Sequence, residues 1–262
     1  MVVIDGLRLA YQRVGTGPPL VLLHGFFGDS RVWRRQLEDL SDEFEVVAWD
    51  TPGCGQSSDP PEAFRIPDYA RCLAGFMQAL GLERANVLGL SFGSTLALEL
   101  YRQHPRLCRS LVLASAYAGW SGSLPGDVVE QRLRKTIADL DLPAAKVVAA
   151  YNVPGLLTES APTRLVAENA VIMSDFHPAG MRAMTRALAE ANLRHLLPHI
   201  ELPTLLLYGD KDVRSPLRLG EDLRSQIPGS RLVVMPGVGH LSNFEAPDRF
   251  DAEVRSFLRS VP

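Results

Sequence analysis

The 262-residue chain is long enough for one large domain, or for one domain with an insertion. Its composition is 46% hydrophobic and 22% charged, which excludes a disordered chain, a coiled coil and a collagen-like repeat. The 27 basic and 30 acidic residues give a net charge of -3, so the chain lacks the basic excess that is typical of a nucleic-acid-binding protein.

The first half of the chain alternates short apolar runs with amphipathic stretches. The runs predict strands at 20–23, 45–49, 86–90 and 110–114, and the stretches predict helices at 33–40, 69–80 and 95–102. Because the strands are apolar on both faces and are separated by helices, they predict a mostly parallel sheet that is covered by helices on both sides. The fold class is therefore α/β.

The pattern changes between residues 118 and 197, where no strong strand signal is present. Helical patterns cover 128–140, 144–151, 163–173 and 179–197, and strands resume at 204–208 and 231–235 before a last helix at 247–258. We therefore expect a core of residues 1–117 and 198–262 with an inserted helical cap of residues 118–197. Open α/β folds bind ligands at the carboxyl edge of the sheet, so an insertion there is a candidate lid.

The sequence also indicates where the protein is located. The N-terminal segment lacks the charged region and apolar stretch of a signal peptide, and no window approaches the length of a membrane helix. Cys54, Cys72 and Cys108 are too few and too irregularly spaced for a disulfide framework or a zinc site, and we interpret them as small apolar core residues. We expect a cytoplasmic protein with no membrane or nucleic-acid partner.

Residues 89–93, Gly-Leu-Ser-Phe-Gly, have the form G-x-S-x-G between a predicted strand and a predicted helix. A serine on such a sharp turn exposes its hydroxyl, and glycines on either side remove side chains that would clash with it. The N-terminal end of the following helix favours a developing negative charge at the same place. This placement, more than the pattern itself, favours Ser91 as a nucleophile.

A serine nucleophile needs a base, and the base needs an acid that orients it. Of the six histidines, His240 lies in a glycine-rich loop after the last predicted strand, where it can approach another loop. The acid should follow a strand between Ser91 and His240, and residues 209–212 do so. Asp212 lies deeper in that loop, whereas Asp210 is better placed to cap the turn, so we assign Asp212.

Several segments together carry a resemblance: 24–28, 50–57, 89–93, 209–212 and 239–240. With these segments in this order, the chain resembles the α/β-hydrolase superfamily over nearly its whole length, and residues 239–245 look like the corresponding stretch of 3-oxoadipate enol-lactonases. The resemblance implies an oxyanion hole formed by the backbone N–H groups of Phe26 and Phe92. We interpret Asp50 and His24 as residues that shape their turns.

Other side chains are candidates for substrate contact. Phe27 and Trp120 are candidate pocket residues, with core packing as the alternative, and Tyr117 and Phe176 are further candidates. The arginines of the insertion are expected to form mostly a solvated helical face. The alternative that one of them pairs with a substrate carboxylate stays open. This set consists of Arg132, Arg134, Arg164, Arg182, Arg186 and Arg194.

These residues predict a serine hydrolase that cleaves a carboxylic ester or lactone, a small molecule, through an acyl-enzyme and without cofactor or metal. Two alternatives keep the triad: a carbon–carbon bond hydrolase acting on meta-cleavage products, and a cofactor-free perhydrolase. Hydrolases that act on meta-cleavage products commonly have Trp after the catalytic histidine, where this chain has Leu241. A non-catalytic receptor for a small ligand is the alternative of another class. Haloalkane dehalogenases and epoxide hydrolases need a carboxylate nucleophile, which Ser91 excludes.

Overall fold

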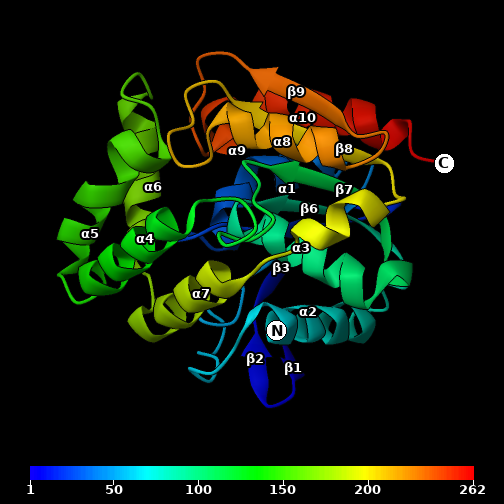
Figure 1. Ribbon diagram of the computed structural model, residues 1–262. Helices are drawn as coiled ribbons and strands as arrows, with labels where there is room; N and C mark the ends of the chain where they lie inside the picture. Colours follow the sequence, from blue (N-terminus) through cyan, green and yellow to red (C-terminus); the bar gives the residue numbers. More distant parts are fainter.

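The computed structural model describes residues 1–262 except for the side chain at position 154. Its centre is a seven-stranded sheet with the order β3-β5-β4-β6-β7-β8-β9 (Figure 1). These strands are β3 (Tyr11–Val14), β4 (Pro19–Leu23), β5 (Glu45–Trp49), β6 (Ala85–Leu90), β7 (Cys108–Ala114), β8 (Thr204–Gly209) and β9 (Arg231–Met235). Only β3 pairs in the antiparallel direction, so the expected mostly parallel sheet is confirmed.

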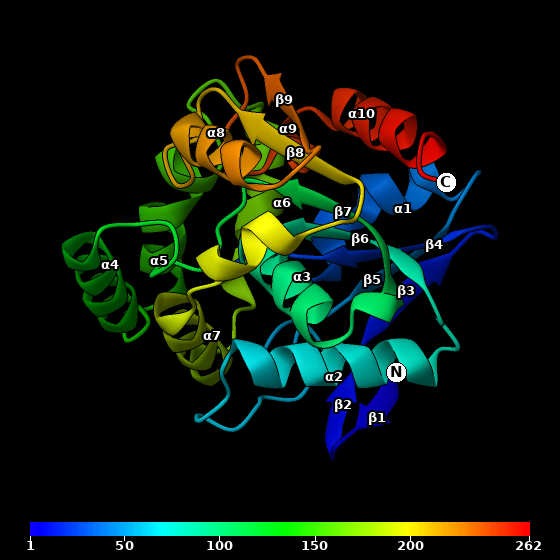
Figure 2. The ribbon, with the colours of Figure 1, turned by 45° about the vertical axis from the view of Figure 1, so that its right-hand side comes forward.

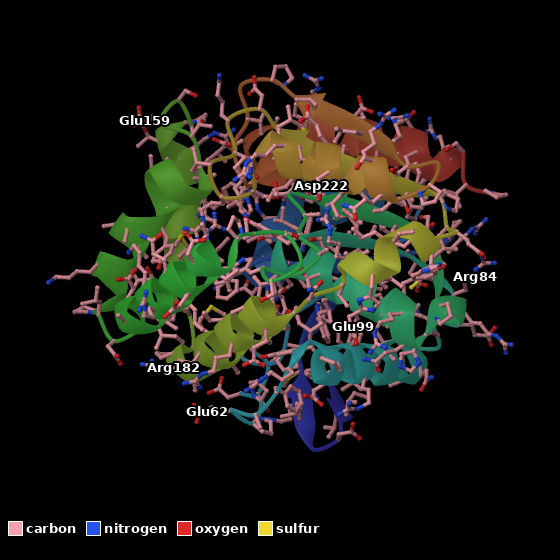
Figure 3. The ribbon with its side chains drawn as sticks, in the orientation of Figure 1. Glu62, Arg84, Glu99, Glu159, Arg182 and Asp222 are labelled. Atoms are coloured by element: carbon pink, nitrogen blue, oxygen red, sulfur yellow. The ribbon has the colours of Figure 1, made fainter. Side chains whose placement is uncertain are left out.

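Helices cover both faces of this sheet, as the apolar strands predict. On one face, α2 (Ile66–Ala79) and α3 (Phe92–Gln103) pack against each other, and α1 (Arg34–Leu40) and α10 (Pro247–Arg259) do so on the other face (Figure 2). Every residue of β6 and β8 is buried, which explains why these strands read as continuous apolar runs. Figure 3 shows charged side chains such as Glu62, Arg84 and Glu159 around the outside of the fold.

The chain between β7 and β8 contains helices and no described strand. The helices are α4 (Gly126–Asp139), α5 (Ala144–Tyr151), η3 (Asn152–Leu156), α6 (Thr163–Ser174), α7 (Pro178–Glu190) and η4 (Arg194–His199). Figure 1 shows α4 to α7 grouped at the left of the molecule, and α4, α5 and α7 stay at the left in Figure 2. We refer to residues 118–197 as the helical insertion.

The predicted helix over 179–197 is wrong in its second half, because α7 ends at Glu190 and a separate short helix follows. The reason is a contact with another loop. The carbonyl groups of Leu188 and Ala191 accept hydrogen bonds from the N–H groups of Trp120 and Gly122, and Ala191 has extended backbone. The last carbonyl groups of α7 are therefore satisfied by residues 120–122, and the helix ends there.

Some elements have no counterpart in the sequence prediction. These are the small hairpin of β1 (Val2–Ile4) and β2 (Leu7–Leu9), the edge strand β3, the helix α8 (Leu217–Gln226), the short helix α9 (Ser242–Glu245) and the 3-10 helix η2 (Pro105–Leu107). A further 3-10 turn, η1 (Ser30–Trp33), precedes α1.

The three cysteines lie inside the fold. Cys54, Cys72 and Cys108 are free and buried, which agrees with their interpretation as core residues. Burial raises the pKa of the Cys72 and Cys108 thiols to about 12. No helix among the described residues is long and apolar enough to cross a membrane.

Candidate active site

Ser91 lies at the turn between β6 and α3, and its backbone is strained. Its φ of 54° and ψ of -112° fall in a region that residues other than glycine rarely adopt. The turn is held by a 2.9 Å hydrogen bond from the Ser91 N–H to the Ala114 carbonyl at the end of β7. A Cβ at Gly89 would lie 2.2 Å from the Gly93 carbonyl oxygen, and one at Gly93 would lie 2.1 Å from that of Leu23. Both glycines are therefore required for this turn.

His240 and Asp212 meet beside this turn. The His240 Nδ1 atom lies 2.8 Å from Asp212 Oδ2, and Asp212 Oδ1 accepts 2.8 Å hydrogen bonds from the N–H groups of Arg214 and Ser215. The side chains of Asp212 and His240 are 0% and 4% exposed. Burial alone would raise the pKa of Asp212, but His240 and the N–H of Ser215 lower it by more. Asp212 is thus a carboxylate, and His240 donates to it through Nδ1–H.

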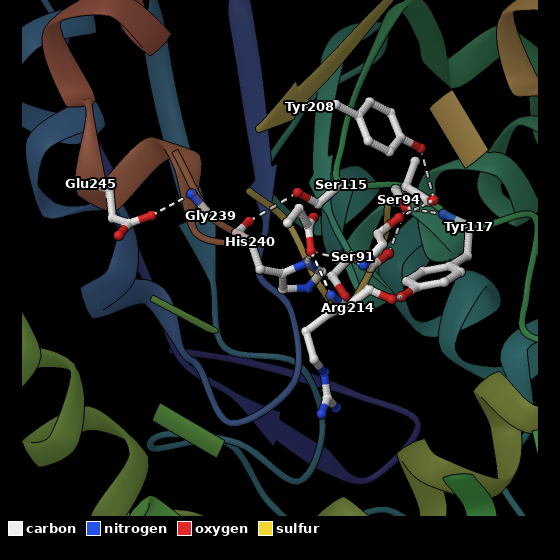
Figure 4. Close-up of polar contacts among 12 residues, drawn as sticks. Ser91, Ser94, Ser115, Tyr117, Tyr208, Arg214, Gly239, His240 and Glu245 are labelled. Atoms are coloured by element: carbon white, nitrogen blue, oxygen red, sulfur yellow. Dashed lines mark hydrogen bonds and ion pairs between the residues drawn. The ribbon is translucent and has the colours of Figure 1, made fainter. Parts of the chain in front are cut away.

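Asp210 lies elsewhere in the same loop. It is exposed, and its Oδ1 atom accepts a 2.7 Å hydrogen bond from the N–H of Gly237. The structure therefore brings Asp212, and not Asp210, to His240. The loop of His240 is tied to the sheet as well, because the Ser115 hydroxyl donates to the His240 carbonyl at 2.9 Å (Figure 4).

The loop after β4 approaches Ser91 from the opposite side. A Cβ at Gly25 would lie 3.1 Å from Ser91 Cβ, so the two segments are in direct contact. Phe92 is the first residue of α3, where N–H groups have no partner within the helix. Within the described residues, the N–H groups of Phe26 and Phe92 have no acceptor. Two free backbone donors thus lie on segments that flank the Ser91 side chain.

Ser91 and His240 line one cavity between the sheet and the helical insertion. The other lining residues are Phe26, Phe27, Tyr117, Trp120, Arg132, Thr136, Leu156, Leu188 and Arg214. The empty space among these side chains is about 410 Å³, yet water-sized molecules have only about 20 Å³ of room in it. Among the described residues, no hydrogen bond joins Ser91 Oγ to His240, a separation that is common before substrate binds.

Phe27 and Trp120 both line this cavity, and both side chains are also buried in the core. The Trp120 ring stacks on Phe26 with 6.3 Å between centroids. Phe27 has a φ of 57° and packs its ring against Tyr151 and Phe176 of the insertion. Arg214, Thr136 and Leu156 were not anticipated, because only the folded chain brings them to Ser91.

His24 and Asp50 hold turns together, which agrees with their interpretation from the sequence. The buried His24 ring accepts a 3.0 Å hydrogen bond from the Thr51 N–H at Nε2, and its Nδ1 lies 2.8 Å from the Gly25 carbonyl. Burial lowers the pKa of His24, so the ring is neutral and Nδ1 is the donor. Asp50 accepts 2.8 Å hydrogen bonds from the N–H groups of Ser30 and Gln56.

Glu245 connects the loop of His240 to the helical insertion. Its Oε2 accepts a 2.6 Å hydrogen bond from the Gly239 N–H (Figure 4), and its Oε1 accepts 2.7 Å bonds from the N–H and the hydroxyl of Thr158. The Leu241 N–H also donates to the Leu156 carbonyl at 3.1 Å. The residues on both sides of the histidine are therefore connected to residues 156–158, Leu241 directly and Gly239 through Glu245. Sequence spacing cannot reveal this connection.

The described residues contain no cluster of three or more His, Cys, Asp or Glu side chains that could hold a metal ion. The cavity itself holds a buried Asp–His pair beside a strained serine, with two free N–H donors nearby. Such a set can generate a nucleophile and stabilise an oxyanion.

Comparison with known proteins agrees with this geometry. Residues 18–247 match the family described as alpha/beta hydrolase fold. A thermophilic esterase from Thermogutta terrifontis, solved with malate bound, superposes with a TM-score of 0.90 at 31% identity over 97% of this chain and 94% of that one. The enol-lactonase from Burkholderia xenovorans gives 0.89 at 26% identity, over 98% of both chains. A putative carbamate hydrolase, RutD, of Cronobacter turicensis is 31% identical over 97% of this chain and 96% of its own length. The chain belongs to the α/β-hydrolase family and is a hydrolase.

Proposed function

We propose that this hydrolase cleaves a carboxylic ester or lactone through an acyl-enzyme on Ser91. The observation that carries the proposal is the single cavity lined by Ser91 and His240, in which His240 is held through Nδ1 by the buried Asp212. With Nδ1 held by Asp212, His240 presents Nε2 as the base for the Ser91 hydroxyl. Relatives named as an esterase and an enol-lactonase support an acyl substrate.

The proposed reaction uses these groups in sequence. The Ser91 Oγ attacks the carbonyl carbon while His240 Nε2 takes its proton, and Asp212 stabilises the imidazolium that forms. The oxygen of the tetrahedral intermediate accepts hydrogen bonds from the N–H groups of Phe26 and Phe92, each worth roughly 3 kcal/mol in such sites. His240 then gives its proton to the leaving oxygen, and a water molecule activated by His240 releases the acid.

The helical insertion acts as a lid in this proposal. It contributes Trp120, Arg132, Thr136, Leu156 and Leu188 to the cavity, whose open room is about 20 Å³. This room holds about one water molecule and no ester. Substrate entry therefore requires the insertion or its side chains to move away from Ser91.

The test is hydrolysis of p-nitrophenyl esters from acetate to decanoate by the wild type and by Ser91→Ala. Ser174→Ala is the matched control, because this serine is exposed on α6 and bonds only to its own helix. Ser91→Ala should lose roughly 10³-fold or more in kcat, whereas the control should match the wild type. Substantial activity in folded Ser91→Ala would refute the assignment of the nucleophile.

A further inference from the structure

Two arginines reach the cavity that contains Ser91. Arg132 comes from α4 in the helical insertion, and Arg214 comes from the loop that also carries Asp212. The two guanidinium groups are close enough that the charge of Arg132 contributes to lowering the pKa of Arg214. The cavity therefore has a positively charged wall in addition to its nucleophile and base.

Neither of these guanidinium groups forms an ion pair with a described carboxylate, which sets them apart from most arginines of the insertion. Arg134 pairs with Glu130, Arg182 with Asp141, Arg186 with Glu62 and Arg194 with Asp222. Those pairs lie at the surface, as Figure 3 shows for Arg182 and Glu62. Arg164 also forms no ion pair with a described carboxylate, but it does not line this cavity. Both arginines at the cavity are thus without a carboxylate partner.

Aromatic rings and neutral oxygens hold the two side chains. The Arg214 Cζ atom lies 5.1 Å from the centroid of the Tyr151 ring, and Arg132 Cζ lies 5.9 Å from that of Trp120. Arg132 also donates to the Tyr117 hydroxyl at 3.2 Å and to the Arg214 carbonyl at 3.1 Å. Stacking fixes the plane of a guanidinium group and leaves its edge N–H groups available.

The Arg214 guanidinium has no acceptor among the described residues, and no dashed line reaches it in Figure 4. Burial lowers the pKa of Arg214, although the residue as a whole is only half-buried. Asp212 is the carboxylate nearest to Arg214 in sequence, but it forms no ion pair with Arg214. It accepts hydrogen bonds from His240 and from two backbone N–H groups instead. A half-buried cation without a counterion is well placed to bind an anion that a ligand supplies.

We propose that the substrate carries a carboxylate apart from its scissile ester or lactone, and that Arg214 and Arg132 bind this carboxylate. The two oxygens of a carboxylate match the paired N–H groups at the edge of a guanidinium. This inference rests on the proposed hydrolase function and specifies its substrate class. The sequence left open which arginine of the insertion binds a substrate carboxylate. The proposal assigns this role to Arg132, acting together with Arg214.

The test compares substrate pairs that differ only in charge. The first pair places the carboxylate in the acyl part: the half p-nitrophenyl ester of adipic acid, and the same ester with its free carboxylate replaced by a primary amide. The second pair places it in the alcohol part: the acetate ester of γ-hydroxybutyrate, and that of γ-hydroxybutyramide. In at least one pair, the wild type should prefer the charged member by roughly tenfold or more in kcat/KM. Added salt should reduce this preference.

Substitutions then assign the preference to residues. Arg214→Gln should bring the ratio of the two kcat/KM values close to one, and Arg132→Gln should reduce it. Arg134→Gln, two residues further along the same helix and paired at the surface, should keep the wild-type ratio. Because each ratio is measured within one protein, a general loss of activity does not affect it. The preference of the wild type for the charged substrate is measured without any variant. The test therefore still gives a result if a variant fails to fold.

The outcomes separate this inference from the proposed function. Hydrolysis of both members at equal kcat/KM in both pairs, or an unchanged preference in folded Arg214→Gln, would overturn the carboxylate site and leave the esterase function in place. If the wild type hydrolyses none of these esters and none of the p-nitrophenyl series, the proposed function fails and the inference fails with it.

Discussion

Glu245→Gln tests whether the helical insertion helps to position His240. The carboxylate of Glu245 accepts hydrogen bonds from Gly239, the residue before His240, and from the N–H and hydroxyl of Thr158. Glutamine has one oxygen and one NH2 group in place of the two oxygens. In either orientation, the NH2 group faces a backbone N–H that then has no acceptor.

The structure sets the size of the expected effect. Loss of one acceptor for a backbone N–H, in a bond that had been assisted by charge, costs roughly 1–3 kcal/mol. If this free energy acts entirely on the position of His240, the fraction of molecules with His240 correctly placed falls by at most roughly 5- to 150-fold. We expect kcat to fall by about tenfold within these bounds. KM should change little, because Glu245 does not line the cavity of Ser91.

The assay is steady-state hydrolysis of p-nitrophenyl butyrate, with thermal unfolding measured in parallel. Thr158→Val removes only the hydroxyl bond and keeps the backbone N–H, so it should lower kcat by less than Glu245→Gln does. Glu253→Gln on α10 is the matched control, because it removes a surface ion pair with Arg231 and should leave kcat unchanged. A folded Glu245→Gln that keeps kcat within about twofold of the wild type would refute the positioning role, even if its Tm fell.

Three further predictions follow from the geometry. Asp212→Asn should lower kcat by roughly 10⁴-fold at neutral pH, because the amide cannot stabilise the imidazolium of His240; p-nitrophenyl butyrate kinetics test this. Gly93→Ala places a Cβ 2.1 Å from the Leu23 carbonyl oxygen, so urea unfolding should show a loss of roughly 3 kcal/mol or more. Burial raises the pKa of Asp251 to about 7, so the folded state binds this proton more tightly than the unfolded state does. The stabilisation is complete below about pH 4 and is lost as the pH rises through about 7, by up to about 4 kcal/mol. Asp251→Leu should remove this decline, and Gln36 keeps its 3.2 Å bond to the Asn243 carbonyl. Parallel pH dependence of urea unfolding in the wild type and this variant would contradict the role of Asp251.

The parallel strands and the serine turn were predictable because their physical requirements are local. A strand buried on both faces must be apolar along its length, and the turn at Ser91 admits only glycine at positions 89 and 93. The choice of Asp212 over Asp210 also followed from local reasoning, since Asp212 lies deeper in the loop and reaches His240. The expected turn cap was wrong in its partner, because Asp210 accepts from the N–H of Gly237 in another loop.

The elements that were missed lack such a local signal. The edge strand β3 is mostly exposed and carries Gln12 and Arg13, so it has no apolar run. The helix α8 is largely polar and contains Gly220, which packs against the Tyr208 ring. Both elements take their structure from the partners that they pack against.

Contacts across the insertion were equally invisible in the sequence. Glu245 and Thr158 are separated by 87 positions, and Arg214 reaches its aromatic neighbour Tyr151 only after the insertion has packed over the sheet. Identifying such residues requires the folded cavity, because no periodicity or motif relates them.

The buried cysteines make the native protein almost inert toward thiol reagents. A disulfide reagent reacts with the thiolate, and all three thiols are shielded from solvent and have a raised pKa. Labelling of the wild type should therefore proceed only as fast as the chain opens, so that the labelling rate reports the rate of unfolding. A single cysteine introduced on the outer face of α4 or α5 would then carry a fluorophore without background labelling and report directly on motion of the insertion.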